Sequence, residues 1–183
     1  MVVSVFKKAE ELHCRLPDLI TRPVGRIMYD TISNSVSSLS EGETLVLDFD
    51  GIKVIDSSFI DEMLIKLLLN SVESTKKFYV KLRNFSKITE INIELVLRSY
   101  SNFKNKKIVV ITENICHNNV FFIGPLSDGE KSIVEFLRIN KSATPSEVAN
   151  FSGLPMTEAR KILNELFSMR VVKKDKEGMF LAV

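Results

Sequence analysis

The fold of this chain is decided by residues 44–69, which read TLVLDFDGIKVIDSSFIDEMLIKLLL. Residues 44–49 are almost continuously apolar, and such a run predicts a strand buried on both faces. Asp50-Gly51 predicts a turn, because Gly adopts backbone angles that other residues resist. Residues 54–55 are apolar again and return the chain to the core.

A buried helix is predicted directly after this strand and turn. Its polar start is Asp56-Ser57-Ser58, where the free backbone N–H groups need acceptors and the helix dipole favours negative charge. These residue types are the usual N-caps, so we expect one of the three to cap the helix. The apolar residues that follow at helical spacing are Phe59, Ile60, Met63, Leu64, Leu67 and Leu68.

This stretch resembles the STAS-like family. The anti-sigma-factor antagonists of that family have a strand, a loop, Asp-Ser-Ser/Thr-Gly and a helix. A divergent STAS-like branch of largely unknown function is closer, with an Arg-led helix, an LDF strand end, a Gly, and Ser-Phe followed by Asp-Glu. The matching positions here are Arg22, Gly25, 47–49, Gly51 and 58–62. The resemblance covers about two-thirds of the chain and implies an α/β fold.

The corner formed by Asp56, Ser57, Ser58, Asp61 and Glu62 is the predicted partner-binding or switch surface. The resemblance aligns Ser57 with the serine that a partner kinase phosphorylates in the antagonists. A helix N-terminus can accept a phosphate. However, Phe59 replaces the family's Gly, and Asp61 and Glu62 would repel the added charge. Capping is therefore the favoured interpretation, and phosphorylation of Ser57 is the alternative. For Arg22 and Arg26 we expect ordinary ion pairing.

The rest of residues 1–124 alternates between strand and helix patterns, which predicts a mixed sheet with packed helices. Strands are expected at 2–6, 77–82, 107–112 and 120–123. A helix after Arg22-Pro23 is expected to bury a stripe from Val24 to Leu39 that includes Ile27. A helix over 86–100 is expected to face the core through Ile88, Ile91, Leu95 and Val96.

Gly124-Pro125 predicts a boundary between two domains, 1–124 and 125–183. Ser127 with Glu130, and Thr144 with Glu147, have the spacing of capping boxes that start two helices. A third helix is expected from Met156 to Met169, and a hairpin from 171 to 183. This order resembles a winged helix-turn-helix, a small α+β domain. The resemblance spans nearly the whole segment, and the short linker predicts that the domains do not move independently.

The third helix is the element that enters the major groove in a helix-turn-helix. The predicted DNA-binding residues on it are Thr157, Arg160, Lys161 and Asn164; those of the wing are Lys173, Lys174 and Lys176. Residues 126–183 contain 9 Lys+Arg and 8 Asp+Glu, a balance of only +1, so the segment lacks the strongly basic surface typical of DNA-binding domains.

The leading hypothesis is a regulator in which the STAS-like domain receives a signal or binds a protein partner and the winged helix binds double-stranded DNA. A homodimer is open, because it would double the basic surface. The alternative hypothesis is a protein–protein adaptor of the anti-sigma-antagonist type without DNA binding.

Composition and motifs argue against most other classes. The chain has 183 residues, 45% apolar content and a net charge of +2, and no apolar run or signal-peptide pattern points to a membrane. Cys14 and Cys116 give no disulfide framework, which favours the cytoplasm. No enzyme or nucleotide-binding motif occurs, so neither catalysis nor a cofactor is expected. The pairs His13-Cys14 and Cys116-His117 could hold zinc only if the fold joined them, and ordinary positions are the favoured interpretation.

Overall fold

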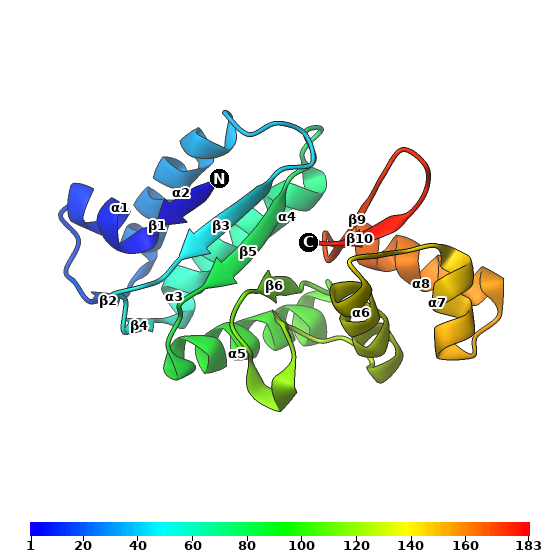
Figure 1. The fold of residues 1–183 in the computed structure, drawn as a ribbon. Helices are drawn as coiled ribbons and strands as arrows, with labels where there is room; N and C mark the ends of the chain where they lie inside the picture. Colours follow the sequence, from blue (N-terminus) through cyan, green and yellow to red (C-terminus); the bar gives the residue numbers. More distant parts are fainter.

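A five-stranded mixed sheet forms the centre of the protein (Figure 1). The computed structural model describes the backbone of residues 1–183 and every side chain except that of Asn118. The strand order is β1-β3-β5-β6-β7, and all neighbours are parallel except β6 and β7. The strands are β1 (Val2–Ser4), β3 (Thr44–Asp48), β5 (Tyr79–Arg83), β6 (Val110–Thr112) and β7 (Phe122–Ile123).

Helices and one further strand pair surround this sheet. The helices are α1 (Val5–Glu11), α2 (Arg22–Val36), α3 (Ser57–Phe59), α4 (Lys66–Glu73) and α5 (Lys87–Lys104), with a π-helical segment η1 (Ile60–Ile65) and a 3-10 turn η2 (His117–Asn119). The strands β2 (Asp18–Leu19) and β4 (Val54–Ile55) pair in parallel beside the main sheet. The mixed α/β architecture predicted from the sequence is confirmed.

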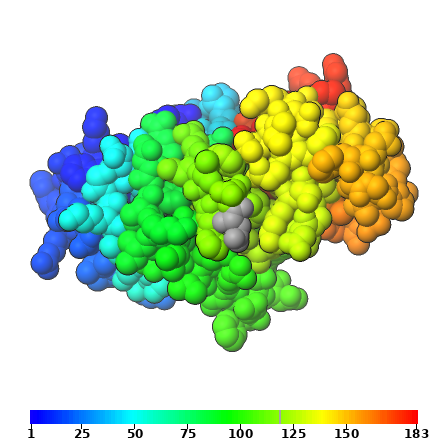
Figure 2. All heavy atoms as spheres, turned by 60° about the horizontal axis from the view of Figure 1, so that its bottom comes forward, coloured from blue at the N-terminus to red at the C-terminus, as the bar shows by residue number. Residues whose placement is uncertain are grey.

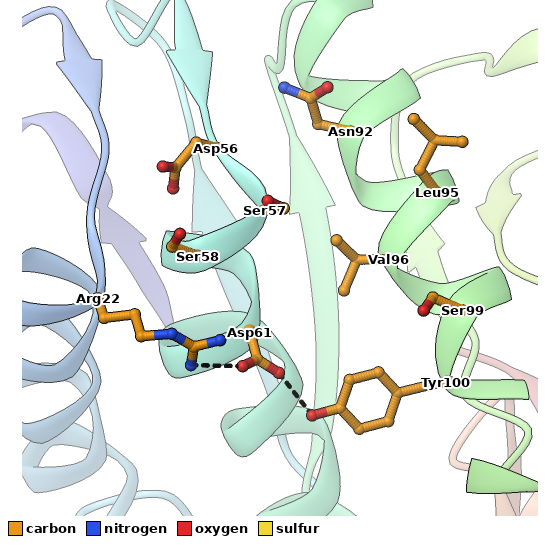
Figure 3. Close-up of a pocket in the computed structure, with 10 residues that line it drawn as sticks. All are labelled: Arg22, Asp56, Ser57, Ser58, Asp61, Asn92, Leu95, Val96, Ser99 and Tyr100. Carbon is orange, nitrogen blue, oxygen red and sulfur yellow. Dashed lines mark hydrogen bonds and ion pairs between the residues drawn. The ribbon is translucent and has the colours of Figure 1, made fainter. Parts of the chain in front are cut away.

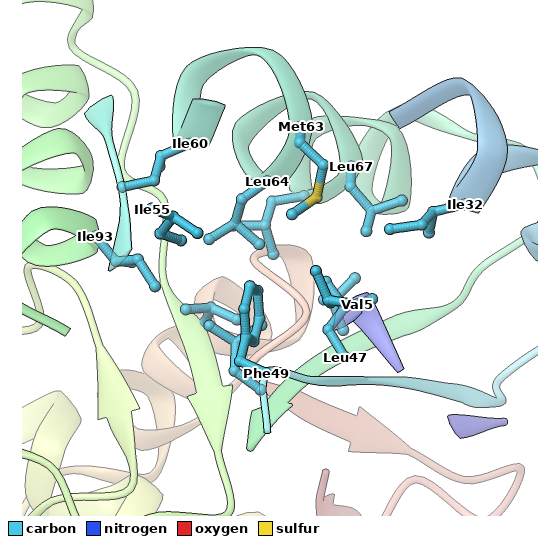
Figure 4. Packing of buried hydrophobic residues seen from close by; sticks show 14 of the residues in the cluster. Val5, Ile32, Leu47, Phe49, Ile55, Ile60, Met63, Leu64, Leu67 and Ile93 are labelled. Carbon is cyan, nitrogen blue, oxygen red and sulfur yellow. The ribbon is translucent and has the colours of Figure 1, made fainter. Parts of the chain in front are cut away.

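The predicted buried helix is a continuous helix over residues 57–73, made of α3, η1 and α4. All six apolar residues of its predicted stripe are buried, as Figure 4 shows for four of them. The sequence did not predict that η1 would be π-helical. A π-helical turn is wider than an α-helical one, and five of the six residues of η1 are buried, including Glu62.

Close packing of α2 on this helix depends on Gly25. A Cβ atom at Gly25 would lie 3.0 Å from both the backbone oxygen of Phe59 and Cβ of Glu62. Such separations are shorter than ordinary van der Waals contact. Gly25 therefore permits an approach that any other residue would push apart.

Burial of the strands differs from the prediction for residues 44–49. In β3 only Leu45 and Leu47 are buried, while Val46 between them is half-buried. The strand buried on both faces is β6, whose Val110 points into the first core and whose Ile111 points into the second. The reason is that the C-terminal helices pack behind β6 and β7 and leave the outer face of β1 and β3 open.

The predicted inward face of α5 is wrong for three of its four residues, and only Val96 packs against the first core. Ile88, Ile91 and Leu95 are 50%, 49% and 61% exposed, whereas Ile93 and Leu97 are fully buried. The helix itself exists, begins after the cap Ser86 and extends to Lys104. Ile27 of α2, which was expected inside, is likewise 51% exposed. The face that each helix turns inward depends on the elements that pack against it. The spacing of apolar residues alone did not identify those elements.

Smaller differences concern the predicted bounds. The strand expected at residues 2–6 ends at Ser4, whose side chain caps α1. The strands expected at 77–82, 107–112 and 120–123 are shorter or displaced by one or two residues, as the bounds of β5, β6 and β7 show.

Residues 125–183 contain three helices and a three-stranded antiparallel sheet. The elements in chain order are α6 (Asp128–Asn140), β8 (Ser142–Ala143), α7 (Pro145–Ser152), α8 (Met156–Ser168), β9 (Val172–Lys174) and β10 (Phe180–Ala182). Both capping boxes are present, at the starts of α6 and α7. The sequence did not reveal β8, a two-residue strand that pairs with β10.

The second hydrophobic core crosses the predicted boundary at Gly124-Pro125. It joins Val109, Ile111 and Phe122 to the apolar faces of α6, α7 and α8. Two polar contacts tie the same parts together. Nζ of Lys107 lies 2.5 Å from the buried carboxylate of Glu130, and Nε of Arg170 donates to the backbone oxygen of Ser71 at 2.9 Å. Residues 125–183 therefore pack directly against the central sheet.

Candidate functional site

The predicted switch corner lies at the start of the helix over residues 57–73, and Asp56 is its cap. One carboxylate oxygen of Asp56 accepts from the backbone N–H of Phe59 at 2.7 Å, and the other accepts from that of Thr21 at 3.3 Å. The cap therefore also fixes the chain that leads into α2. Ser57 is exposed and Ser58 half-buried, and no side-chain hydrogen bond involves either serine among the described residues.

The corner borders a hollow of about 580 Å³ between the helix start and α5 (Figure 3). Its wall on the α5 side carries polar groups beside an apolar patch. The lining residues are Arg22, Asp56, Ser57, Ser58, Asp61, Asn92, Leu95, Val96, Ser99 and Tyr100. Four hydroxyl groups, one amide and two carboxylates thus meet around one hollow, a mixture suited to a polar or peptide ligand.

An ion-pair network holds the floor of this hollow. Nη1 of Arg22 lies 2.7 Å from Oδ2 of Asp61 and 2.9 Å from Oε1 of Glu62. The hydroxyl of Tyr100 donates to Oδ1 of Asp61 at 2.5 Å, as Figure 3 shows. Asp61 therefore links α2 to α5 through the corner.

Glu62 is the more heavily paired carboxylate. It is 6% exposed and accepts from Arg22, Arg26 at 3.5 Å, and Lys66. Hydrogen bonds from Lys66, Arg22 and Arg26 lower the pKa of Glu62 to about 2. For Asp61, burial raises the pKa, but the hydrogen bonds from Tyr100 and Arg22 more than offset this and leave the pKa below its ordinary value.

These pairings change one inference made from the sequence. Asp61 and Glu62 were expected to repel a phosphate on Ser57, yet three cations neutralise the two carboxylates. The charge objection is therefore weaker than the sequence suggested. Phosphorylation of Ser57 stays a prediction.

The other candidate ligand sets are not brought together. Among the described residues, no group of three or more His, Cys, Asp or Glu side chains is arranged to hold a metal ion. Asp48, the last residue of β3, pairs with Arg83 at 2.9 Å. Cys14 and Cys116 are free thiols, and burial raises the pKa of Cys116 to about 11.

The predicted DNA-contacting residues of α8 lie on one accessible face. Thr157, Arg160, Lys161 and Asn164 are all exposed. Figures 1 and 2 place α7 and α8 at the opposite end of the molecule from α1 and α2. On the hairpin, Lys174 and Lys176 are exposed.

Lys173 differs from these two lysines. It is half-buried, and its Nζ lies 5.0 Å from the ring centroid of Tyr79 in β5. The side chain therefore points toward the central sheet. Alternation along β9 explains this placement, because neighbouring residues of a strand face opposite sides.

Comparison with known proteins identifies one part of the chain. Residues 25–86 match a STAS-like domain of unknown function (DUF4325). The match runs from Gly25 in α2 to Ser86 before α5 and contains the whole switch corner. The match includes neither Arg22 nor Tyr100 of α5, although both side chains contact Asp61. We call the switch corner the STAS-like corner. No curated protein matches the chain.

Several contributors to the STAS-like corner escaped sequence reasoning. Tyr100 and Asn92 lie on α5, 39 and 36 residues from Asp61 and Asp56, so no local spacing could have paired them. Lys66 is different, because it follows Glu62 by four residues on one helix, a spacing that favours a salt bridge. That signal was present in the sequence and was missed.

Among the described residues, no helix combines the length and the apolar composition needed to cross a bilayer.

Proposed function

We propose that this protein is a DNA-binding regulator in which residues 125–183 form a winged helix and the STAS-like corner receives a partner. The observation that carries the proposal is the face of α8. It presents Thr157, Arg160, Lys161 and Asn164 to solvent, on the second helix of a pair joined by a short turn. In helix-turn-helix proteins this is the helix that reads the major groove.

The charges on this face of α8 favour contact with DNA but do not predict high affinity. Among the described residues, Arg160 has no carboxylate within 4.0 Å, and Lys161 has only Glu165, at 4.0 Å. Lys174 and Lys176 add two exposed cations on the hairpin. Glu158 and Glu165 on α8 oppose them, so we expect modest affinity for random DNA.

A physical connection between the two ends supports regulation. The helix over residues 57–73 starts at Asp56 in the corner, and its other end carries Ser71, whose backbone oxygen accepts from Arg170 just after α8. Displacement of the helix by a partner at the corner would reach α8 through this contact. The proposed mechanism is a change in the seating of residues 125–183 on the sheet.

Fluorescence anisotropy of the full chain with random duplex DNA, at low and moderate salt, tests the DNA-binding part. Arg160→Glu/Lys161→Glu should abolish binding, and the natural chain should bind more weakly as salt rises, because phosphate contacts release counterions. Lys7→Glu/Lys8→Glu, on α1 at the other end, is the matched control and should bind as the natural chain does. Equal loss in both double variants, or no binding at low salt, would reject the proposal.

The second candidate is a protein-interaction role, and the exposed face of α5 favours it. Ile88, Ile91 and Leu95 form an apolar stripe between two hollows, one at the STAS-like corner and one of about 630 Å³ on the other side of α5. Contiguous exposed apolar residues are typical of contact surfaces. Lys87 and Glu94 flank the stripe, so two copies of α5 packed antiparallel around Ile91 would place each Lys87 near the other copy's Glu94. We therefore take a second copy of the chain as the occupant.

Sedimentation velocity tests this second candidate. Leu95→Glu should convert dimer to monomer, and Lys87→Glu/Glu94→Lys, which exchanges the two charges, should keep the dimer. A natural chain that is monomeric at high concentration would exclude this use of α5.

A further inference from the structure

A third, smaller hollow lies where the central sheet meets residues 125–183. Its volume is about 190 Å³. Its walls are largely apolar and come from β6, α6 and the residues of β9 and β10, with Lys81 of β5 and Arg138 of α6 as its cations. The two predicted functional surfaces, the STAS-like corner and the α8 face, do not include it.

Lys81 is the unusual group in this hollow. It is half-buried, and among the described residues it has neither a hydrogen bond nor a carboxylate within 4.0 Å. A charged side chain removed from water ordinarily finds a partner. Burial lowers the pKa of Lys81, and the positive charge of Lys141 lowers it further against an opposing effect of Glu113. The charged form of Lys81 is therefore less favourable here than it would be in water.

Lys173 is a second cation on this face of the sheet, close enough to Lys81 to feel its charge although it is not part of the lining of the hollow. Tyr79 and Lys81 are two residues apart on β5 and so share a face, and Nζ of Lys173 lies 5.0 Å from the Tyr79 ring. Lys173 is also half-buried, and its pKa is lowered by burial and then by the charge of Lys81. Among the described residues it too has no carboxylate within 4.0 Å.

The nearby acidic groups are engaged elsewhere. Glu113 lines the hollow but lies 3.8 Å from Nη1 of Arg83, and Glu43 accepts from the backbone N–H of Ser40 at 2.7 Å. Arg138 is already paired with Glu135 at 2.8 Å and stacks on Phe121, with Cζ 4.0 Å from the ring centroid. The excess charge at this junction is therefore positive: Lys81, Lys173 and the exposed Lys141 carry it, and the charges of Glu113 and Glu43 offset it only in part.

We propose that this hollow binds a small organic carboxylate, with its carboxylate on Lys81, assisted by Lys173, and its apolar body against the walls from β6 and α6. The apolar lining favours an organic body over inorganic phosphate. The volume corresponds to about six water molecules at ~30 Å³ each. It is below the ~300 Å³ of sites for drug-sized ligands, which limits the ligand to a carboxylate with one short aliphatic chain or one ring.

Such a ligand would touch both β5 and the strands β9 and β10. Its binding would strengthen the contact between the sheet and residues 125–183 and would so change how these residues pack on the sheet. The inference goes beyond the proposed DNA binding and does not depend on it, because ligand binding is measured without DNA.

Benzoate is the probe, titrated into the isotope-labelled full chain and followed by 1H–15N correlation spectra. We expect saturable shifts at the amides of residues 81, 111–113 and 171–173. Lys81→Met should weaken binding about tenfold or more, because a hydrogen bond to a charged group is lost. Lys173→Met should weaken it several-fold, and Lys176→Met, at the exposed hairpin turn, should leave it unchanged.

Two further probes, titrated into the natural chain, separate the contribution of the carboxylate charge from that of the apolar ring. Benzyl alcohol, which keeps the ring without the charge, and inorganic phosphate, which keeps charge without the ring, should each bind at least tenfold more weakly than benzoate. Absence of saturable shifts with benzoate, equal binding of benzyl alcohol or phosphate, or full binding by a folded Lys81→Met variant would overturn the proposal.

Discussion

Two helices of this protein carry apolar residues at the same spacing and use them in opposite ways. The helix over residues 57–73 buries its whole predicted stripe, whereas α5 exposes Ile88, Ile91 and Leu95 and buries Thr89 and Glu90 on another face. Helical spacing therefore predicted both helices correctly but the orientation of only one.

The difference follows from what surrounds each helix. The first packs against α2, the sheet and α5, so most of its surface is covered, and Ser57, Lys66, Val72 and Glu73 are its exposed residues. By contrast, α5 contacts β4, β7 and η1 on one side only. Its orientation is fixed by Ile93 and Leu97 in the core and by Glu90, whose Oε1 accepts from the backbone N–H of His117 at 2.7 Å. A buried carboxylate with partners can thus decide which apolar residues remain outside.

The largest effect on stability is expected when an aromatic ring is removed from the helix over residues 57–73. Phe59 is fully buried, and Phe59→Ala should lower the free energy of unfolding by ~3–5 kcal/mol, since it removes buried area and leaves a cavity. Phe103→Ala on α5 is the matched control, because Phe103 is 86% exposed, and it should change stability by less than ~0.5 kcal/mol. Urea denaturation followed by circular dichroism measures both. Similar losses in the two variants would mean that the contrast between the helices does not hold.

A smaller loss of stability is expected when one methyl group is added between α2 and the helix over residues 57–73. Gly25→Ala should destabilise by ~1–3 kcal/mol, because the new Cβ meets the Phe59 backbone oxygen and Glu62 Cβ at 3.0 Å. Gly129→Ala in α6 is the control: nothing lies within 4 Å of its Cβ position, so the better helix propensity of Ala should leave stability equal or higher. Thermal denaturation compares the two. A stabilised Gly25→Ala would show that α2 is not held this closely.

The next effect depends on pH. The folded-state pKa of Glu62, about 2, lies below its ordinary value of 4.5, so its contribution to stability is present above about pH 4.5 and is lost as the pH falls through 2. Glu62→Gln should therefore be less stable than the natural chain at pH 7, with a gap that closes as the pH falls from 4.5 toward 2. Urea denaturation over this pH series measures the gap, with exposed Glu41→Gln as control. A gap that is independent of pH would contradict the pairing of Glu62 with Arg22, Arg26 and Lys66.

The smallest effect is expected on the exposed face of α5. Ile91→Ala should change the stability of the monomer by less than ~0.5 kcal/mol, because the side chain is 49% exposed. Ile93→Ala, two residues away and fully buried, should cost ~2–4 kcal/mol. The pair tests the rotation of α5 directly, and denaturation at low protein concentration keeps self-association out of the measurement. A reversed order would restore the orientation expected from the sequence.

For the candidate site, local sequence predicted the capping but not the walls. A cap among Asp56, Ser57 and Ser58, and both capping boxes of the C-terminal segment, follow from residue types within three positions of each other; the structure selects Asp56. The Asp61–Tyr100 hydrogen bond and the seat of Lys173 against Tyr79 join residues far apart in the chain. No spacing rule reaches across such distances, because the path of the intervening chain decides which side chains meet.

The sequence by itself determined the alternation of strands and helices, the buried helix that follows Asp56-Ser57-Ser58, a cap among those three residues, and the three C-terminal helices. These features depend on periodicity and on hydrogen bonds between near neighbours, both of which are written locally. Only the tertiary structure decided the exposed stripe on α5, the double burial of β6 and the cationic hollow around Lys81. Each of these depends on which surface packs against which. Burial is a property shared by distant segments, so no single segment can specify it.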